Sequence, residues 1–453
     1  MLEKIQQLFA LAPQGPLNGY LVLEIGGNIS GPMAGEELAR RGALVVKIEM
    51  PGIGDPARSY LSPSIFTSCN ASKASIVIDK HNEHDNQMYT ELLSLADVVI
   101  DNRSPDAKHR DEILQRFLHN DKLNPIIFCS IVGYDSADYH DRPALDVAVQ
   151  AETGMAMVNA ASAHEPLKVG FVVVDTVTGL QAASSIKDHL LALQRGMRCD
   201  AHQKNVIFLE QSMAKTSALL MTGQYLQAYA QGKDAFREGN RDLWVAPFSF
   251  YKTKNGMISL AIIGDALFAI FCDKVLQQKE LAEQYPTNQS RIENIAAFES
   301  ILCARLAEKT SEEWIALCRQ YNIVCSQVNT ITQMLQQPFA SQMIAKTQDG
   351  TAIIADSCTS SLYQSQLIQG APNLDANKAS LQALLAYRQQ YDLSKRTFSD
   401  VKQQFDLQLN MRERAPQYTM RYQAQQRPPF VTPHVSNAQE NARKMLLGMR
   451  AKL

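Results

Sequence analysis

The sequence predicts a doubly wound α/β fold for most of the chain, with a smaller α+β domain after it. Between residues 20 and 131, short apolar runs alternate with helix-like segments, as in a parallel sheet with helices on both faces. The runs are nearly continuous in apolar character, which is typical of strands covered on both faces. After residue 240 the pattern changes to a hairpin signal and helices, which predicts the second domain.

The first predicted β-α-β unit spans a strand, a glycine-rich break, a helix and a second strand, at 20–25, 26–32, 33–41 and 43–49. The glycines of the break allow the turn to approach a ligand closely, and the helix start after it offers N–H groups to phosphates. The break does not match G-x-G-x-x-G, so a plain tight turn is the alternative.

The alternation continues through three more predicted strands, at 75–79, 97–101 and 126–131, with helices at 87–96 and 111–119. Right-handed connections place the carboxyl ends of parallel strands at one edge of the sheet, where ligands bind. We therefore expect the turns that follow the strands to gather at that edge, namely 26–31, 50–58, 79–81 and 102–104.

A second informative stretch is the apolar run Val169–Val174, which ends on Asp175 and precedes a helix-like segment at 180–194. We predict a strand that feeds a helix and presents a carboxylate at the junction. Backbone N–H groups there can keep the carboxylate ionised, and such a carboxylate can form a mixed anhydride with an acyl group. The alternative is that Asp175 is simply the N-cap of the helix.

The predicted domain boundaries divide the chain into a large α/β domain, a small α+β domain, a return to the large domain and a C-terminal extension, at 1–230, 231–330, 331–378 and 379–453. In the small domain Thr310 and Glu313 have capping-box spacing, and Trp314 and Cys318 share a helical face and are expected in the core. The extension is rich in Gln and Arg, so we expect an arm packed on a neighbour or a partly disordered segment.

Composition excludes several functional classes. The 453 residues carry a net charge of −2, so no basic field indicates nucleic acid or an anionic membrane surface as a partner. There is no apolar run of membrane-spanning length and no signal-peptide pattern. The eight cysteines and nine histidines lack metal-ligand spacing. We therefore expect a cytoplasmic protein with reduced thiols and without a metal.

A series of motifs in chain order resembles the class III CoA-transferases (the CaiB/BaiF type). The motifs are Leu23-Glu-Ile, Ser30-Gly-Pro32, Gly42-Ala-Leu-Val-Val-Lys-Ile-Glu49, Gly54-Asp-Pro-Ala-Arg58, Lys73-x-Ser75, Ala96-Asp-Val-Val-Ile-Asp-Asn102, Gly133-Tyr, Asp141-Arg-Pro, Asp146, Gln150-Ala, Gly170, Asp175, Gly179, Gly239-Asn240 and Ala246-Pro247. Each motif is loose, but their order and spacing together are specific.

The resemblance implies a Rossmann-like large domain and a homodimer of interlocked rings. It implies that Asp175 is the nucleophile in moving CoA from an acyl-CoA to a small carboxylic acid through aspartyl anhydride and aspartyl-CoA thioester intermediates. Asp146 matches an acidic position near the nucleophile, and a structural acid or cap is the alternative for it.

The same resemblance implies a set of residues that bind CoA, which is a substrate here. Ile29 and Ser30 would contact it through their backbone, and Arg110 would contact a phosphate. The adenosine side and the turn beyond it would be formed by Ile78, Asp79, Lys80, His81, Asn102, Arg103 and Ser104.

Two other functions are compatible with the same fold. One is an isomerase like the α-methylacyl-CoA racemases, but their proton-transferring His is replaced here by Leu145, which cannot move a proton. The other is a CoA-binding paralogue without turnover. It is suggested by departures such as Met50, which stands where several relatives carry a basic residue, and by Ala371-Pro-Asn-Leu-Asp375.

Overall fold

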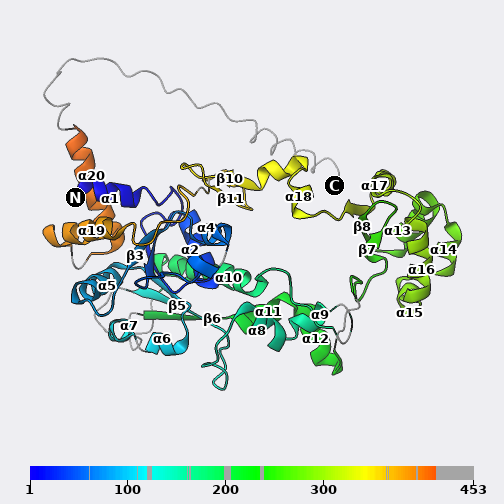
Figure 1. Ribbon diagram of the computed structural model, residues 1–453, viewed down its shortest axis with the longest axis horizontal. Coiled ribbons are helices and arrows are strands. Elements are labelled where there is room, and N and C mark those ends of the chain that lie inside the picture. The colour runs from blue at the N-terminus through cyan, green and yellow to red at the C-terminus, as the bar shows by residue number, and fades with distance from the viewer. Residues whose placement is uncertain are drawn as a thin grey trace, which may run out of the picture. The chain divides into compact units, whose positions relative to one another are not determined.

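The computed structural model describes residues 1–414 apart from 61, 110, 120–124, 161, 163–164, 198–205, 235–238, 364, 366 and 394–395. The described chain forms two compact units (Figure 1). Of the described residues, unit 1 comprises those within 1–130, 182–209 and 345–414, and unit 2 comprises those within 131–181 and 210–344. The boundaries drawn from the sequence at 231, 331 and 379 remain a prediction.

A six-stranded sheet with the order β3-β2-β1-β4-β5-β6 lies at the centre of unit 1. Its first four neighbouring pairs are parallel. The order reverses direction between β1 and β4, the switch point beside which ligands bind in open α/β sheets. The strands are β1 (Leu21–Ile25), β2 (Leu44–Glu49), β3 (Ala74–Val77), β4 (Val98–Asp101), β5 (Ile126–Val132) and β6 (Val206–Ser212).

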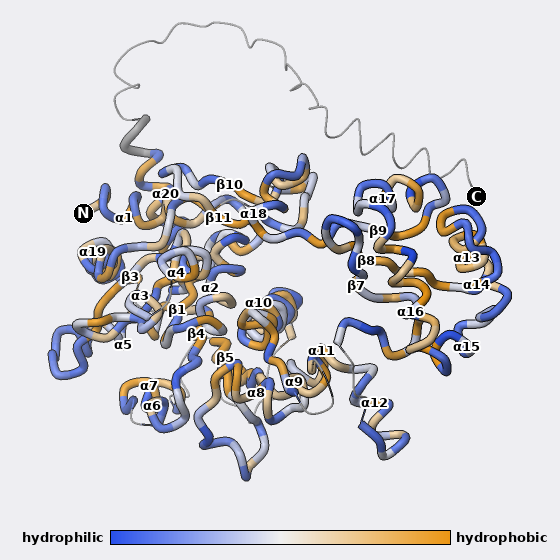
Figure 2. The backbone as a smooth tube through the Cα atoms, turned by 45° about the vertical axis from the view of Figure 1, so that its right-hand side comes forward, coloured by the Kyte–Doolittle hydropathy of each residue, from blue (hydrophilic) through white to orange (hydrophobic). Residues whose placement is uncertain are grey.

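The predicted strands are confirmed. Their apolar runs form strands because both faces of the sheet are covered. All residues of β1, β2 and β4 are buried, and β4 and β5 lie mainly at the hydrophobic end of the colour scale (Figure 2). The helices predicted at 33–41, 87–96 and 111–119 correspond to α2 (Ser30–Arg40), α5 (Glu83–Leu95) and α7 (Glu112–Leu118). Three further short helices, which the sequence pattern does not predict, are α3 (Ala57–Tyr60), α4 (Pro63–Asn70) and α6 (Pro105–His109).

Both ends of the described chain complete the core of unit 1. Helix α1 (Leu2–Phe9) packs with α19 (Lys378–Gln390) and α20 (Phe398–Arg414). The ring of Phe9 lies 5.7 Å from that of Phe398 and 5.3 Å from that of Phe405. The expectation of an arm or a disordered segment after 378 was therefore wrong as far as these helices extend, because their apolar faces are buried. The sequence also predicts an amphipathic helix at 438–451, which lies outside the described residues.

Unit 2 contains two groups of elements. The first consists of the short helices α8 (Asp146–Glu152), α9 (Met155–Val158), α11 (Met213–Leu220) and α12 (Thr222–Gln231). The second is an antiparallel sheet of β7 (Phe248–Lys252), β8 (Met257–Ala261) and β9 (Val324–Gln327), covered on one face by helices that include α13 (Asp265–Ile270), α16 (Ile295–Leu306) and α17 (Ser311–Gln320).

Three predictions for this second group are confirmed. The hairpin forms between β7 and β8. Thr310 and Glu313 make a reciprocal capping box at the start of α17, and Trp314 and Cys318 are buried in the core. The sequence between 211 and 231 also predicts one continuous helix. The structure has two helices there, because the backbone at Met221 (φ −113°, ψ 31°) is not helical.

The strand predicted over 169–174 was wrong. Helix α10 begins at Val173 and runs 22 residues to Gln194, so the valines before Asp175 start a helix. None of the described helices of either unit combines the length and apolar character needed to cross a membrane.

Candidate active site

The turn at the carboxyl end of β1 is held from one side by Asn102. The Asn102 side-chain oxygen accepts the N–H of Gly27 at 3.1 Å, and its nitrogen donates to the Gly27 carbonyl at 2.8 Å and to Ser30 Oγ at 3.3 Å. A Cβ atom on Gly26 would lie 2.0 Å from this oxygen, so only glycine fits there. Asn102 therefore shapes the predicted CoA-binding turn.

Helix α2 starts directly after this turn. Its N-cap residue is Ile29, whose apolar side chain cannot accept a hydrogen bond from the first N–H groups of the helix. The first N–H groups of an α-helix lack intrahelical partners and attract anions. The arrangement therefore suits a phosphate or carboxylate near Ile29 and Ser30.

The turns after β2, β3 and β4 meet this edge of unit 1, as predicted. Asp55 accepts the N–H of Asn28 at 3.0 Å. Asp111 accepts Lys80 at 2.8 Å and Arg103 at 3.0 Å, so residues far apart in the sequence come together. Burial raises the pKa of Asp111, but these two cations lower it below its usual value.

Arg103 is held mainly by protein carboxylates. Its guanidinium also pairs with Asp101 at 2.7 Å, a carboxylate that is fully buried. Lys80, in contrast, has 45% of its side chain exposed. Of these two predicted contacts, Lys80 is the more accessible to an anionic ligand.

The other predicted contacts differ in their surroundings. Ile78 is buried in the core of unit 1, so only its backbone can face a ligand. Asp79 accepts the N–H of the exposed His81 at 3.0 Å, and Ser104 Oγ accepts the N–H of Ala107 at 3.4 Å. Arg110 lies outside the described residues.

The two predicted catalytic carboxylates lie together at the start of α10. Asp175 is the third residue of this helix and is half-buried. Asp146 accepts the N–H of Val174 at 2.8 Å and that of Asp175 at 3.3 Å through the same oxygen. The N-cap interpretation of Asp175 was therefore wrong, because the carboxylate that receives these N–H groups belongs to Asp146.

Gln150 connects this pair to the turn before the helix, and sequence reasoning assigned it no role. Its side-chain nitrogen donates to the second oxygen of Asp146, and its oxygen accepts the N–H of Val169 at 2.8 Å. The available signal was the spacing of Asp146 and Gln150, four residues apart and hence on one helical face. Both side chains are buried.

The family model for CoA-transferase family III matches residues 17–378. The chain belongs to this family. A family III CoA-transferase is an enzyme, and the similarity therefore supports transfer of CoA as the activity.

Named relatives agree with this assignment. The chain is 28% identical over 333 residues to the succinyl-CoA:glutarate CoA-transferase of Mus musculus, which covers 71% of this chain and 74% of the relative. It is 27% identical to the acetyl-CoA:oxalate CoA-transferase of Acetobacter aceti, over 82% of this chain and 95% of that one. A crystal structure of a CaiB/BaiF family protein from Brucella suis matches with a TM-score of 0.71 and 25% identity, over 82% of this chain and all of that one.

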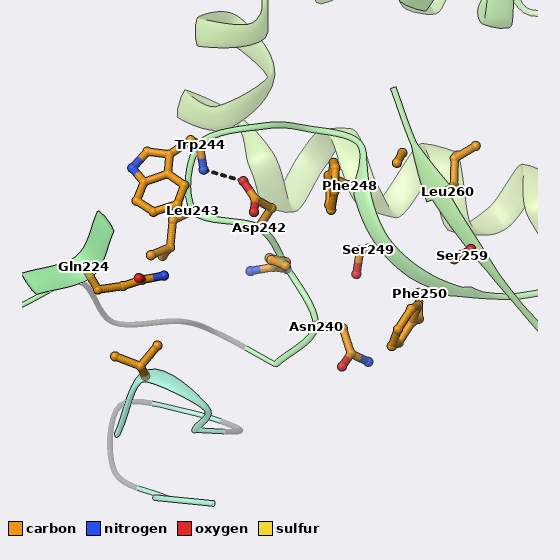
Figure 3. A pocket seen from close by; sticks show the side chains of 13 residues that line it. Gln224, Asn240, Asp242, Leu243, Trp244, Phe248, Ser249, Phe250, Ser259 and Leu260 are labelled. Carbon is orange, nitrogen blue, oxygen red and sulfur yellow. Dashed lines mark hydrogen bonds between the residues drawn. The ribbon is translucent and has the colours of Figure 1, made fainter. Parts of the chain in front are cut away.

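Unit 2 of this family III CoA-transferase also contains a hollow of about 320 Å³ beside β7 and β8. Asp242 shapes its wall by accepting the N–H of Trp244 at 2.9 Å (Figure 3). Aromatic side chains and serine hydroxyls both line it, so it can hold a small ligand with apolar and polar parts. The lining includes Asn240, Asp242, Trp244, Phe248, Ser249, Phe250 and Ser259.

Proposed function

We propose that this family III CoA-transferase moves CoA from an acyl-CoA donor to a small carboxylic acid in the cytoplasm, with Asp175 as the covalent nucleophile. One observation carries the proposal. Asp146 accepts the N–H groups of Val174 and Asp175, so a second, buried carboxylate holds the backbone that carries the Asp175 side chain.

The proposed reaction has four balanced steps. An oxygen of Asp175 attacks the acyl carbonyl carbon, the C–S bond breaks, and an acyl-aspartyl anhydride and the CoA thiolate result. The thiolate attacks the aspartyl carbonyl carbon, which releases the donor acid and leaves an aspartyl-CoA thioester. The acceptor carboxylate attacks that thioester and gives a second anhydride and the thiolate. The thiolate then takes the acceptor acyl group, and Asp175 is regenerated.

In this proposal CoA binds at the strand-end edge of unit 1. The turn after β1 and the start of α2 supply backbone N–H groups near Ile29 and Ser30. Lys80 supplies an accessible positive charge, and Asn102 holds the turn. Asp146 acts by positioning the start of α10, since its buried carboxylate is already bonded to Gln150 and to two backbone N–H groups.

The acceptor and the assembly are also proposals. The named relatives use glutarate and oxalate, which makes short dicarboxylic acids the first acceptors to test, and the hollow beside β7 and β8 is the site proposed for them. We also propose the interlocked homodimer. It is supported by exposed Phe250 and Val324 on the uncovered face of the β7–β9 sheet, and light scattering of the purified chain tests it.

Trapping with hydroxylamine tests the nucleophile. Incubation with an acyl-CoA donor and hydroxylamine should inactivate the enzyme and convert Asp175 to its hydroxamate, which peptide mass spectrometry detects. No modification, with exchange of the donor's α-proton in heavy water, would indicate an isomerase instead. Bound CoA without either reaction would indicate a binding protein.

A further inference from the structure

Four motifs that the proposed function leaves unexplained converge on one buried group of charges in unit 1. Lys47 Nζ lies 2.7 Å from a carboxylate oxygen of Glu24 and 2.7 Å from one of Asp55. Lys73 Nζ lies 2.5 Å from the other oxygen of Glu24. These four side chains are almost completely buried.

A second ion pair is joined to this group through the backbone. Glu49 binds Arg58 at 2.7 Å, accepts the N–H of Asp55 at 2.8 Å and accepts the Ser75 hydroxyl at 2.6 Å. The resulting network of three carboxylates and three cations is electrically balanced. We name it the turn-supporting network, and it consists of Glu24, Lys47, Glu49, Asp55, Arg58 and Lys73.

The network contacts the CoA-binding turn at two points. Asp55 accepts the N–H of Asn28 at 3.0 Å and that of Ala57 at 2.8 Å through one oxygen. Asn28 has φ 61°, a left-handed conformation that only a few non-glycine residues adopt. Lys73 donates to the carbonyl of Pro32, in the first turn of α2, at 2.8 Å.

The contact with the turn is close-packed. A Cβ atom on Gly27 would lie 2.4 Å from the Asp55 oxygen that accepts the Asn28 N–H, so the turn rests directly on this carboxylate. Burial raises the pKa of Asp55, but Lys47 and the two N–H donors lower it below its usual value. The carboxylate is therefore ionised. One of its oxygens lies beside Lys47 Nζ, and the other accepts the N–H of Asn28.

A buried ion network is weak evidence for stability, since well-packed apolar side chains often serve as well. Its geometric effect is more specific. A carboxylate fixed by a buried lysine can hold the N–H of Asn28 in one place, and Asn102 holds the N–H of the preceding residue, Gly27. Together they fix two successive backbone N–H groups of the turn.

We propose that Asp55 is a positioning residue for CoA binding, which acts by holding Asn28 so that the turn and the start of α2 present their N–H groups to CoA. This inference rests on the proposed function, because it assumes that CoA binds at this turn.

The test measures binding of free CoA to the full-length chain by calorimetry, together with turnover at saturating acyl-CoA. Asp55→Ala should weaken CoA binding by about tenfold or more, because a misplaced turn loses several aligned donors at once. Turnover at saturation should fall much less, so that KM rises more than kcat falls. Asp55→Asn keeps an oxygen for both N–H groups and should bind CoA more tightly than Asp55→Ala.

The matched control is Asp97→Ala. Asp97, the residue before β4, accepts the N–H of Leu21 at 2.8 Å, at the opposite end of β1, so its loss removes another acidic side chain that holds a backbone N–H of this strand. CoA binding by this variant should stay within about twofold of that of the unmodified enzyme, because this end of β1 is remote from the turn.

Gly27→Ala tests the same contact without removing a buried charge. The added Cβ displaces the turn from Asp55, and CoA binding should weaken as in Asp55→Ala, so the test stands even where Asp55→Ala fails to fold. Unchanged CoA binding in folded Asp55→Ala or Gly27→Ala, or equal weakening in Asp97→Ala, would overturn the positioning role alone. An unmodified enzyme that binds no CoA would overturn both this inference and the proposed function.

Discussion

One carboxylate oxygen of Asp146 accepts the backbone N–H of Asp175 and that of the preceding Val174. Asp146 is itself the first residue of α8, so a buried side chain from one helix holds the start of another. Anions at helix starts are favoured by the unpaired N–H groups and by the helix dipole. The side chain of Asp175 is thus carried by a turn whose backbone is already fixed.

Loss of this contact should reduce activity more than stability. We expect Asp146→Ala to lower the free energy of unfolding by about 0.5–2 kcal/mol, as for a lost N-cap, and to lower kcat by about tenfold to a hundredfold through misplacement of Asp175. Asp146→Asn keeps the acceptor oxygen and should retain more activity than Asp146→Ala. Chemical denaturation and steady-state kinetics measure the two effects, and equal activity of both variants would contradict the positioning role.

Removal of the nucleophile should abolish transfer while leaving the fold intact. Asp175→Ala is expected to lower kcat by about a thousandfold or more and to bind free CoA nearly as well as the unmodified enzyme. Asp188→Ala is the matched control, since Asp188 is an exposed residue of the same helix and its loss should leave kcat unchanged. Substantial turnover by Asp175→Ala would exclude the covalent mechanism.

The two cations at Asp111 should differ in their roles. Arg103→Ala leaves Asp101 and Asp111 buried with fewer partners, so we expect a loss of about 3–5 kcal/mol in the free energy of unfolding. Lys80→Ala should cost little stability, about 1 kcal/mol or less, but should weaken CoA binding, most clearly at low salt. Denaturation and CoA titration at two salt concentrations distinguish the two cases. A stable Arg103→Ala would contradict this assignment.

Asp97 should give the enzyme a stability that depends on pH. Burial raises the pKa of Asp97 from 3.8 to about 7. Between these values the folded chain keeps the proton and the unfolded chain does not, so the free energy of unfolding falls as the pH rises, by up to ~1.4 kcal/mol per pH unit. Below this pH window the Asp97 carboxyl does not change the free energy of unfolding. Above the window, the free energy of unfolding stays lower by a constant amount.

The measurement for Asp97 compares denaturation of the unmodified enzyme with that of Asp97→Asn across this pH range. The asparagine cannot ionise and still has an oxygen for the Leu21 N–H, so its stability relative to the unmodified enzyme should rise between pH 4 and pH 7. Parallel stability curves would show that the Asp97 carboxyl titrates normally.

The local sequence pattern was sufficient to predict the strands of the unit 1 sheet, because these buried strands are continuous apolar runs separated by turn residues. It failed at 169–174, where β-branched valines favour a strand. The group that starts the helix there is Asp146, some thirty residues earlier in the sequence, and no local propensity reports such a contact.

The candidate site shows the same division. The turn residues at 26–31 and 102–104 could be expected to meet from the topology alone. The burial of Lys47 and Lys73 could not, because their carboxylate partners, Glu24 and Asp55, come from two other segments and lysine is almost never buried without a partner. From the sequence, Gln150 could be placed only on the same helical face as Asp146. Its hydrogen bond with the N–H of Val169 depends on the tertiary structure.

The packing of Phe9 against Phe398 and Phe405 has a consequence for biosynthesis. The ring of Phe9 can contact both of its aromatic partners only after residue 405 has been synthesised. Residues 210–344 of unit 2 are synthesised earlier and contain their own core. On the ribosome, the apolar face of α1 is therefore without these contacts during most of translation, and closure of the core of unit 1 is a late event. A chain ended at residue 378, where the family match stops, would leave that face permanently open to chaperones and to aggregation.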